Sequence, residues 1–388
     1  MPNPFPYTFP KKGDNINFAA AEPIYNLSTF GPDFRAPYAE NFQLSIEREL
    51  PARVVARVSY VGSLGRHNQS TTDANPITPA GHAACVADPN CATSGYLESY
   101  FYPQYTLLNN PNILDIGQVD SGASSSYHSL QANVEKGMTH GLTFQLSYTY
   151  AHALDTGSSF ENAGFGESSA RGYNQFAPLL NYGDSAYDVR QRIVFSPIYI
   201  TPTLHSAGAW YSPLNLAVSG WEISGIVTAA TGFPFDVSYA GGSSNSDWCP
   251  FYTNFYACPD APNQVAPIVK TDPRVRSVAH GTSDAYVSKA SFANEPIGMF
   301  GDAHRNPGHG PGINNTNMIL AKNFNLSSDS RIRLQFRMES DNVFNHTQFT
   351  NPGTTWNDGV LGNANSSFGR ISGTAAARQT QLAAKLYF

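Results

Sequence analysis

The chain has 388 residues, with 23 Lys and Arg against 29 Asp and Glu, and its formal net charge of −6 gives no basic field that would attract nucleic acid. Its 32 Gly, 27 Pro and 13% aromatic residues favour a folded, loop-rich β structure over a collagenous or disordered chain. No run of about 18 apolar residues occurs, which excludes a transmembrane helix. A transmembrane β-barrel stays open, because its alternating strands have a low average hydropathy.

The N-terminal residues MPNPFPYTFPKKGDN do not form a secretory signal. They contain no charged region followed by an apolar stretch, which such a signal requires. We therefore expect either a cytosolic protein or a true start that lies upstream of Met1.

Alternation of apolar and polar residues predicts an antiparallel all-β chain. No segment has the periodicity of a convincing amphipathic helix. The nine expected strands are Phe42–Glu47, Arg53–Tyr60, His128–Glu135, Leu142–Tyr150, Val189–Ile200, Val218–Tyr239, Asn317–Phe324, Arg331–Glu339 and Gln379–Phe388.

The strand at Arg331–Glu339 has two chemically different faces. We expect its apolar row to meet lipid, and this row consists of Ile332, Leu334, Phe336 and Met338. We expect the opposite row to face the lumen of a barrel, and it consists of Arg331, Arg333, Gln335, Arg337 and Glu339. A stripe of arginines that binds nucleic acid is the alternative. It is less favoured because it leaves the apolar row without a partner.

The connections between the expected strands alternate between short and long. Short ones lie near Leu50–Ala52, Gly137–Gly141, Thr201–Asn215 and Asn325–Ser330. Long ones cover Gly62–Ser126, Ala153–Asp188, Ala240–Thr316 and Phe344–Arg378. Outer-membrane barrels have this asymmetry, with short periplasmic turns and long extracellular loops. A soluble sandwich or propeller has no reason to sort its loops by length.

An odd number of strands indicates that the chain is the C-terminal part of a larger barrel, since single-chain bacterial barrels have an even number. The last strand lacks a first strand with which to close. We therefore expect an open sheet in which Gln379–Phe388 pairs only with the strand around Arg331–Val343, and whose C-terminus lies in the periplasm.

The four cysteines form two close pairs in long loops, Cys85 with Cys91 and Cys249 with Cys258. We predict two disulfides on the cell-exterior side, because such loop pairs suit an oxidising compartment. A zinc site is the alternative, although the spacings are longer than those of usual structural zinc motifs.

No other motif indicates chemistry. His280, His304 and His309 lie in one long loop without the spacing of a metal site, so we interpret them as solvated. The glycine-rich stretch Gly301–Gly312 lacks the ending of a P-loop, and no G-x-S-x-G or H-E-x-x-H motif occurs. We therefore predict no enzyme activity, no metal and no cofactor.

Several stretches together resemble the C-terminal β-barrel portion of TonB-dependent outer-membrane receptors, in particular the Oar-like branch. They are NFQLSIERELPARVVARVSYVGSLGRH, YHSLQANVEKGMTHGLTFQLSYTYAHALD, YGDSAYDVRQRIVF, GWEISGIVTAATGFPFDV, FGDAHRNPGHGPGINNTNMILAKNF, RIRLQFRMESDNVFNHTQF and the closing FGRI with ARQTQLAAKLYF. The family's plug domain and TonB-box are absent from the chain, so contact with TonB is expected only through a missing N-terminal part.

The resemblance implies an outer-membrane barrel in a Gram-negative bacterium, with about nine of roughly 22 strands present. Its partners would be outer-membrane lipid, the barrel-assembly machinery and a large or scarce substrate. Residues 1–40 would be an extracellular loop remnant, and residues 41–388 the barrel part. The closing strand resembles the C-terminal assembly signal of outer-membrane proteins, so we expect this role for Leu382, Ala384, Leu386 and Phe388.

Two other functions stay open. A non-transporting surface or adhesion protein would bind partners through its long loops, residues 62–126 and 240–316. A soluble β-rich glycan-binding or hydrolytic protein would need paired carboxylates, for which the sequence offers no candidate.

Overall fold

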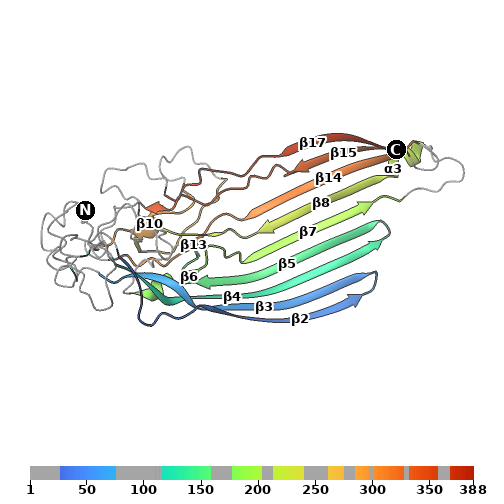
Figure 1. Cartoon of the computed structure of the whole chain (residues 1–388). Helices are drawn as coiled ribbons and strands as arrows, with labels where there is room; N and C mark the ends of the chain where they lie inside the picture. Colours follow the sequence, from blue (N-terminus) through green and yellow to red (C-terminus); the bar gives the residue numbers. More distant parts are fainter. Residues whose placement is uncertain are drawn as a thin grey trace, which may run out of the picture.

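The computed structural model describes residues 27–75, 110, 113, 116–158, 177–202, 213–239, 261–274, 285–296, 300–326, 332–356 and 368–388. Nine long strands lie side by side in one antiparallel sheet, in the order β17-β15-β14-β8-β7-β5-β4-β3-β2 (Figure 1). Neighbours in the sheet are thus neighbours along the chain, as the sequence predicts. The strands are β2 (Tyr38–Leu50), β3 (Val54–Asp73), β4 (Ile116–Thr139), β5 (Leu142–Asp155), β7 (Gln191–Ile200), β8 (Trp221–Ala230), β14 (Ile313–Asn325), β15 (Arg333–Asp341) and β17 (Gln379–Tyr387).

The sheet is open. Strand β17 pairs with β15 at one border, and β2 pairs with β3 at the other. Among the described residues, no pairing joins β2 to β17, so the predicted open sheet is confirmed. The described helices include none that is long and apolar enough to cross a membrane.

The connections are sorted by length to opposite ends of the sheet, as predicted. One end, here the short-turn end, carries the connections 51–53, 140–141, 201–220 and 326–332 together with the C-terminus (Figure 1). At β4–β5 the turn residues His140 and Gly141 both have positive φ, 51° and 79°, which is the type I′ geometry that suits the twist of a hairpin. A Cβ at Gly141 would lie 2.2 Å from the Ile200 carbonyl oxygen. The opposite end is the long-loop end.

The expected single strand Val218–Tyr239 is wrong. A short helix, α3 (Pro213–Val218), precedes β8, and Gly220 separates them with φ 75°. A side chain at Gly220 would collide with the Asn323 carbonyl oxygen, 2.6 Å from an added Cβ. Beyond β8 the chain leaves the sheet in two short pieces, β9 (Pro234–Phe235) and β10 (Ser238–Tyr239). A six-residue helix is too short to show a helical period in the sequence.

Strands β3 and β4 are longer than expected, with 20 and 24 residues. About 9–11 residues suffice to cross a bilayer, so their far halves extend beyond it at the long-loop end. The Ser- and Gly-rich segments, expected as loop, stay paired through irregular register between Gly65 and Ser70. Two short strands pair at the same end of the sheet: β1 (Leu27–Phe30) pairs with the extension of β4, and β6 (Gly183–Asp184) pairs with the end of β5.

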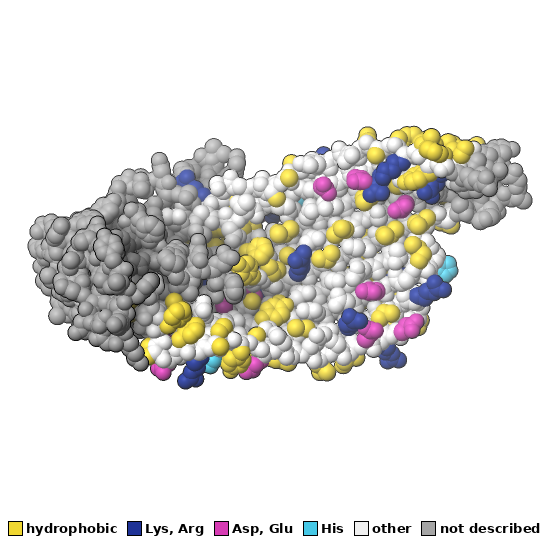
Figure 2. All heavy atoms as spheres, viewed as in Figure 1, with side chains coloured by type: hydrophobic (Ala, Val, Ile, Leu, Met, Phe, Trp, Pro, Cys, Tyr) yellow, Lys and Arg dark blue, Asp and Glu magenta, His cyan; other side chains and the backbone are white. Residues whose placement is uncertain are grey.

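The register gives the sheet one apolar and one polar face, since directly paired residues point to the same side. A row on the apolar face consists of Leu142, Tyr199, Ile223, Leu320, Met338 and Leu382. A row on the polar face consists of Glu47, Arg57, Asn133, Ser147, Val194, Thr228 and Asn315. Acidic and basic side chains are scattered over the strands (Figure 2). Large side chains of the apolar face are exposed, which is the pattern of a surface that lipid covers.

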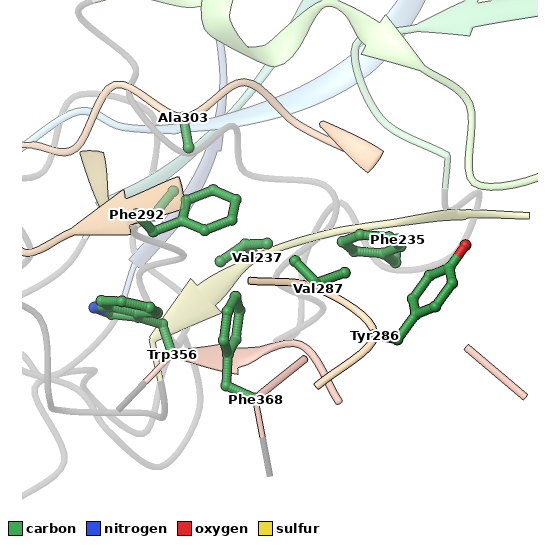
Figure 3. Packing of buried hydrophobic residues seen from close by; sticks show 9 residues of the cluster. Phe235, Val237, Tyr286, Val287, Phe292, Ala303, Trp356 and Phe368 are labelled. Atoms are coloured by element: carbon green, nitrogen blue, oxygen red, sulfur yellow. The ribbon is translucent and has the colours of Figure 1, made fainter. Parts of the chain in front are cut away.

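A small hydrophobic core lies outside the sheet at the long-loop end, where β10 lies in Figure 1, and Figure 3 shows how its side chains pack. Its members come from three distant parts of the chain, and the rings of Phe292, Trp356 and Phe368 meet edge to face or tilted at 5.0–6.1 Å. Short strand pairs frame it, formed by β9 with β13 (Gly308–His309), β10 with β16 (Thr355–Trp356), and β11 (Asn263–Gln264) with β12 (Phe292–Ala293). The buried members are Phe235, Val237, Ala261, Tyr286, Val287, Phe292, Ala303, Trp356 and Phe368.

Candidate functional site

Among the described residues, five charged or titratable side chains meet where β5, β6 and β7 reach the long-loop end. We call this group the charged cluster, and it consists of His152, Asp184, Asp188, Arg190 and His309. His152 belongs to β5 and Asp184 to β6, while His309 is brought in by β13 from a loop more than a hundred residues away along the chain.

Arg190 is the centre of this cluster. Its Nη2 lies 2.8 Å from Asp184 Oδ1, and its Nε lies 2.6 Å from Asp188 Oδ2. The Asp188 side chain is fully buried, and its second oxygen accepts a hydrogen bond from the Ala153 amide at 2.7 Å. Burial lowers the pKa of Arg190, but the hydrogen bond to Asp188 and the two carboxylate charges outweigh this and raise it above its ordinary value. Arg190 therefore holds both carboxylates in one place.

His309 contacts the cluster from the opposite side. Its Nε2 lies 3.3 Å from Asp184 Oδ2 and 3.6 Å from Asp188 Oδ2, and this nitrogen is buried without a hydrogen-bond partner. The interpretation of His309 as a solvated residue is therefore wrong. His304 is exposed, as expected, and His280 lies outside the described residues.

Asp184, Asp188 and His309 offer three ligand atoms within 4.8 Å of one another, a set that suits a divalent cation in its types of donor. The guanidinium of Arg190 already binds an oxygen of each carboxylate. It supplies the positive charge that the two carboxylates need. The arrangement thus works as an ionic crosslink between the sheet and the loop that carries His309.

A second crosslink lies beside the first. Arg305 forms a buried ion pair with Asp155 at the end of β5. It also donates to Ser158 Oγ at 2.9 Å and to the Asn181 carbonyl oxygen at 3.0 Å. Burial lowers the pKa of Arg305 to about 10, so it stays protonated at neutral pH.

Asn306 joins these crosslinks to the hydrophobic core. Its side-chain amide donates to the Asp184 carbonyl oxygen at 2.7 Å, and its backbone amide donates to Asp236 Oδ1 at 3.2 Å. Asp236 also accepts from the Val237 amide at 3.0 Å. Burial raises the pKa of Asp236 to about 6, although both of these hydrogen bonds act in the opposite direction. Loop, core and sheet are therefore held as one unit at the long-loop end.

The residues predicted to face a lumen share one face of β15. Arg333, Gln335, Arg337 and Glu339 all lie on the polar face, and Arg331 lies outside the described residues. Gln335 donates to Asn323 Oδ1 on β14 at 3.0 Å, and Arg337 forms an ion pair with Glu339. The structure thus brings these side chains together as one polar row.

The other predicted residues are far from the charged cluster. Leu382, Ala384 and Leu386 lie on the apolar face of β17, and the terminal Phe388 is exposed. The four cysteines, Cys85, Cys91, Cys249 and Cys258, lie outside the described residues.

No curated protein matches the sequence. Among solved structures, the outer membrane transporter YddB from Escherichia coli has a TM-score of 0.42 and 10% identity, with 93% of this chain and 34% of that chain covered. The FrpB iron transporter from Neisseria meningitidis has a TM-score of 0.36 and 10% identity, with 93% and 33% covered. The ferripyoverdine receptor of Pseudomonas aeruginosa has a TM-score of 0.38 and 10% identity, with 90% and 27% covered.

The chain thus spans about a third or less of each of these proteins. The family model described as outer membrane beta barrel domain matches residues 1–381, which is nearly the whole chain. The match agrees with the open antiparallel sheet, its two faces and its sorted connections. The chain belongs to the outer membrane β-barrel domain family, and its location is the outer membrane of a Gram-negative bacterium.

Proposed function

We propose that the chain is the C-terminal part of the barrel of a TonB-dependent receptor of the Oar-like branch, which takes up a large or scarce substrate. The observation that carries this proposal is that, among the described residues, β2 and β17 have no partner at the two borders of a nine-strand sheet. Every residue of β2 is exposed. Unpaired backbone groups are not tolerated in lipid, so further strands must complete the barrel.

The two faces support a wide barrel with a polar interior. The apolar face would meet lipid, and the polar face, with Arg333, Arg337 and Glu339, would line a lumen. A lumen lined by charges of both signs suits the passage of a polar substrate. Barrels of roughly 22 strands have a lumen wide enough to hold a plug and to admit substrates too large for simple pores.

The first test measures the size of the native protein. An antibody against residues 379–388 would detect the protein in outer-membrane fractions of the source bacterium. We expect a heat-modifiable polypeptide considerably larger than the 42.0 kDa of this chain, with a plug encoded in frame upstream of Met1. A folded, membrane-inserted monomer of 42.0 kDa would contradict the proposal.

The second test measures energy coupling. Site-specific cross-linking in cells should join the intact protein to TonB, and deletion of the TonB gene should abolish uptake without changing the amount of protein in the membrane. Unchanged uptake in the deletion strain would contradict a TonB-dependent mechanism.

A non-transporting surface protein is the second candidate, because the long loops contain a hydrophobic core. The core around Val287, together with the crosslinks of Arg190 and Arg305, gives the long-loop end a fixed shape that a partner can bind. Such a protein would lose adhesion when residues 240–312, which precede β14, are removed, and no uptake would be lost.

Three further proposals rest on the resemblance to TonB-dependent receptors and on the spacing of the cysteines. The pairs Cys85–Cys91 and Cys249–Cys258 form disulfides in the long loops. Residues 1–40 are the remnant of an extracellular loop, with 41–388 as the barrel part. Leu382, Ala384, Leu386 and Phe388 are the signal that the barrel-assembly machinery reads.

A further inference from the structure

The apolar face carries positive charges near the short-turn end, whereas at the long-loop end Arg66 of β3 lies on the same face. Arg48 on β2, Lys136 on β4 and Lys322 on β14 lie on this face, because they pair with Ala56, Val54 and Phe336 respectively. All three lie within a few residues of the short-turn end. Lys322 is buried, with only 6% of its surface exposed, so the name basic rim refers to Arg48 and Lys136, which are exposed and half-buried respectively.

Side-chain carboxylates are absent from the same region of this face, as far as the structure describes it. From the short connections up to the row of Leu44, Tyr60, Leu130 and Tyr150, every glutamate of the sheet lies on the polar face. These glutamates are Glu47, Glu49, Glu135, Glu222 and Glu339. On the polar face Arg57 pairs with Glu47 and Arg337 with Glu339, whereas among the described residues the basic rim has no acidic neighbour.

The side chains of both lysines point toward the short-turn end of the sheet. Lys136 Nζ lies 3.5 Å from the Ala52 and Gly137 carbonyl oxygens, in or beside the short connections. Lys322 Nζ donates to the Ser219 carbonyl oxygen and lies 4.9 Å from the centre of the Trp221 ring. Carbonyl oxygens orient an ammonium group but do not neutralise its charge. These contacts cover the ammonium group of Lys322, whereas half-buried Lys136 has the geometry of a lysine that reaches from the hydrocarbon to the headgroup region.

An isolated cation on a lipid-facing surface is stabilised by an anion at the level of the headgroups. We infer that the basic rim binds the phosphate groups of anionic phospholipids in the periplasmic leaflet. This inference rests on the proposed function for its orientation, because the proposed barrel has its short turns in the periplasm. The basic rim then fixes the depth at which this part of the barrel sits in the outer membrane, at its periplasmic surface.

The test measures which lipids the protein retains. The intact outer-membrane protein would be placed in nanodiscs of equal amounts of phosphatidylcholine and phosphatidylglycerol, and native mass spectrometry would count the lipids that stay bound after release. We expect phosphatidylglycerol to be retained in preference. The double variant Arg48→Gln with Lys136→Gln should lose this preference, by roughly fivefold for each cation removed. High salt should weaken it in the unchanged protein.

Two controls separate this effect from general loss of charge or of packing. Lys385→Gln removes a cation of β17 near the same end but on the polar face, where it pairs with Gln335, and should leave the preference unchanged. The double variant Arg48→Lys with Lys136→Arg keeps both charges and should retain it. The inference would be overturned if Lys385→Gln reduced the preference for phosphatidylglycerol equally, or if the unchanged protein showed no such preference.

The orientation is tested separately with an Ala52→Cys variant, whose cysteine lies in the β2–β3 connection. We expect a membrane-impermeant maleimide to label it only after the outer membrane is permeabilised. Labelling in intact cells would overturn both this inference and the proposed function. Labelling confined to permeabilised cells, without a preference for phosphatidylglycerol, would overturn this inference alone.

Discussion

Arg305 and Asp155 form a buried ion pair across 150 residues of sequence, with side chains only 8% and 10% exposed. Asp155 is the last residue of β5, whereas Arg305 belongs to the long connection between β8 and β14. Because a buried charge is costly without its partner, each residue depends on the other for its position. The pair therefore fastens the long connection to the sheet.

We predict that Arg305→Met destabilises the long-loop end by about 3–5 kcal/mol, because it leaves the Asp155 carboxylate buried and unpaired. Limited proteolysis of the outer-membrane protein should show faster cleavage within residues 285–312, since local opening becomes easier. Arg274→Met is the matched control, because its ion pair with Asp272 is exposed and its loss should leave the cleavage rate unchanged. Equal cleavage of both variants would contradict the role given to Arg305.

Asp236 should make the long-loop end more stable at mildly acidic pH than at neutral pH. Burial raises its pKa to about 6 in the folded protein, so the folded state binds the proton more tightly than the unfolded state. Its stabilising contribution is complete below about pH 4 and is lost as the pH rises through 6. Asp236→Asn should remove this dependence and stabilise the region at pH 7 by about 2–3 kcal/mol.

The measurement for Asp236 is the protease cleavage rate of the same region at several pH values from 4 to 7, with digestion by a protease that is active throughout. Asn keeps an oxygen for the amides of Val237 and Asn306, so packing is preserved. A variant whose cleavage still accelerates between pH 5 and 7 would show that another group titrates there.

The assignment of the apolar face to lipid predicts different costs along β15. Leu334 is one residue inside the strand, next to the short-turn end, whereas Met338 is near its middle. Met338→Arg should cost about 2–4 kcal/mol, as expected near the bilayer midplane, and Leu334→Arg about 0–1 kcal/mol. Gln335→Arg on the polar face is the control, with little expected change. Urea midpoints in lipid vesicles would measure all three, and the reverse order would mean that the polar face meets lipid.

The sheet could be predicted because alternation is a local signal. The strand at Leu142–Tyr150 shows both of its faces within nine consecutive letters, and its partner strands follow directly along the chain. Gly220 and the helix before it were missed because a six-residue helix has less than two turns in which to display a period. The far ends of β3 and β4 were missed because Ser and Gly residues resemble a loop.

The charged cluster could not be predicted, because its members come together only through the fold. Asp184, Asp188 and Arg190 are close in sequence, but this spacing is common in loops. His309 joins them only because β13 pairs with β9, and no local pattern in the sequence predicts that pairing. A histidine that contacts two carboxylates is therefore indistinguishable, in the sequence, from a solvated one such as His304.

The cysteine pairs predict a specific peptide map. Digestion without reduction should yield two linked peptide pairs, one with Cys85 and Cys91 and the other with Cys249 and Cys258. Free thiols at all four positions in protein isolated under alkylating conditions would contradict the disulfides. Zinc bound at four thiolates would support the alternative instead.

The last strand predicts an assembly defect that is separate from stability. Leu382 and Leu386 lie on the apolar face of β17, and Phe388 is 98% exposed, so deletion of Phe388 removes little packing within the described chain. If Phe388 belongs to the assembly signal, its deletion should lower the folded, heat-modifiable fraction of the intact protein in outer membranes. The urea midpoint of the fraction that does fold should be unchanged. Tyr387→Phe is the control, because it keeps the aromatic ring beside Arg333. Unchanged assembly after deletion of Phe388 would contradict the signal, and equal loss in Tyr387→Phe would point to the pairing of β17 with β15 instead.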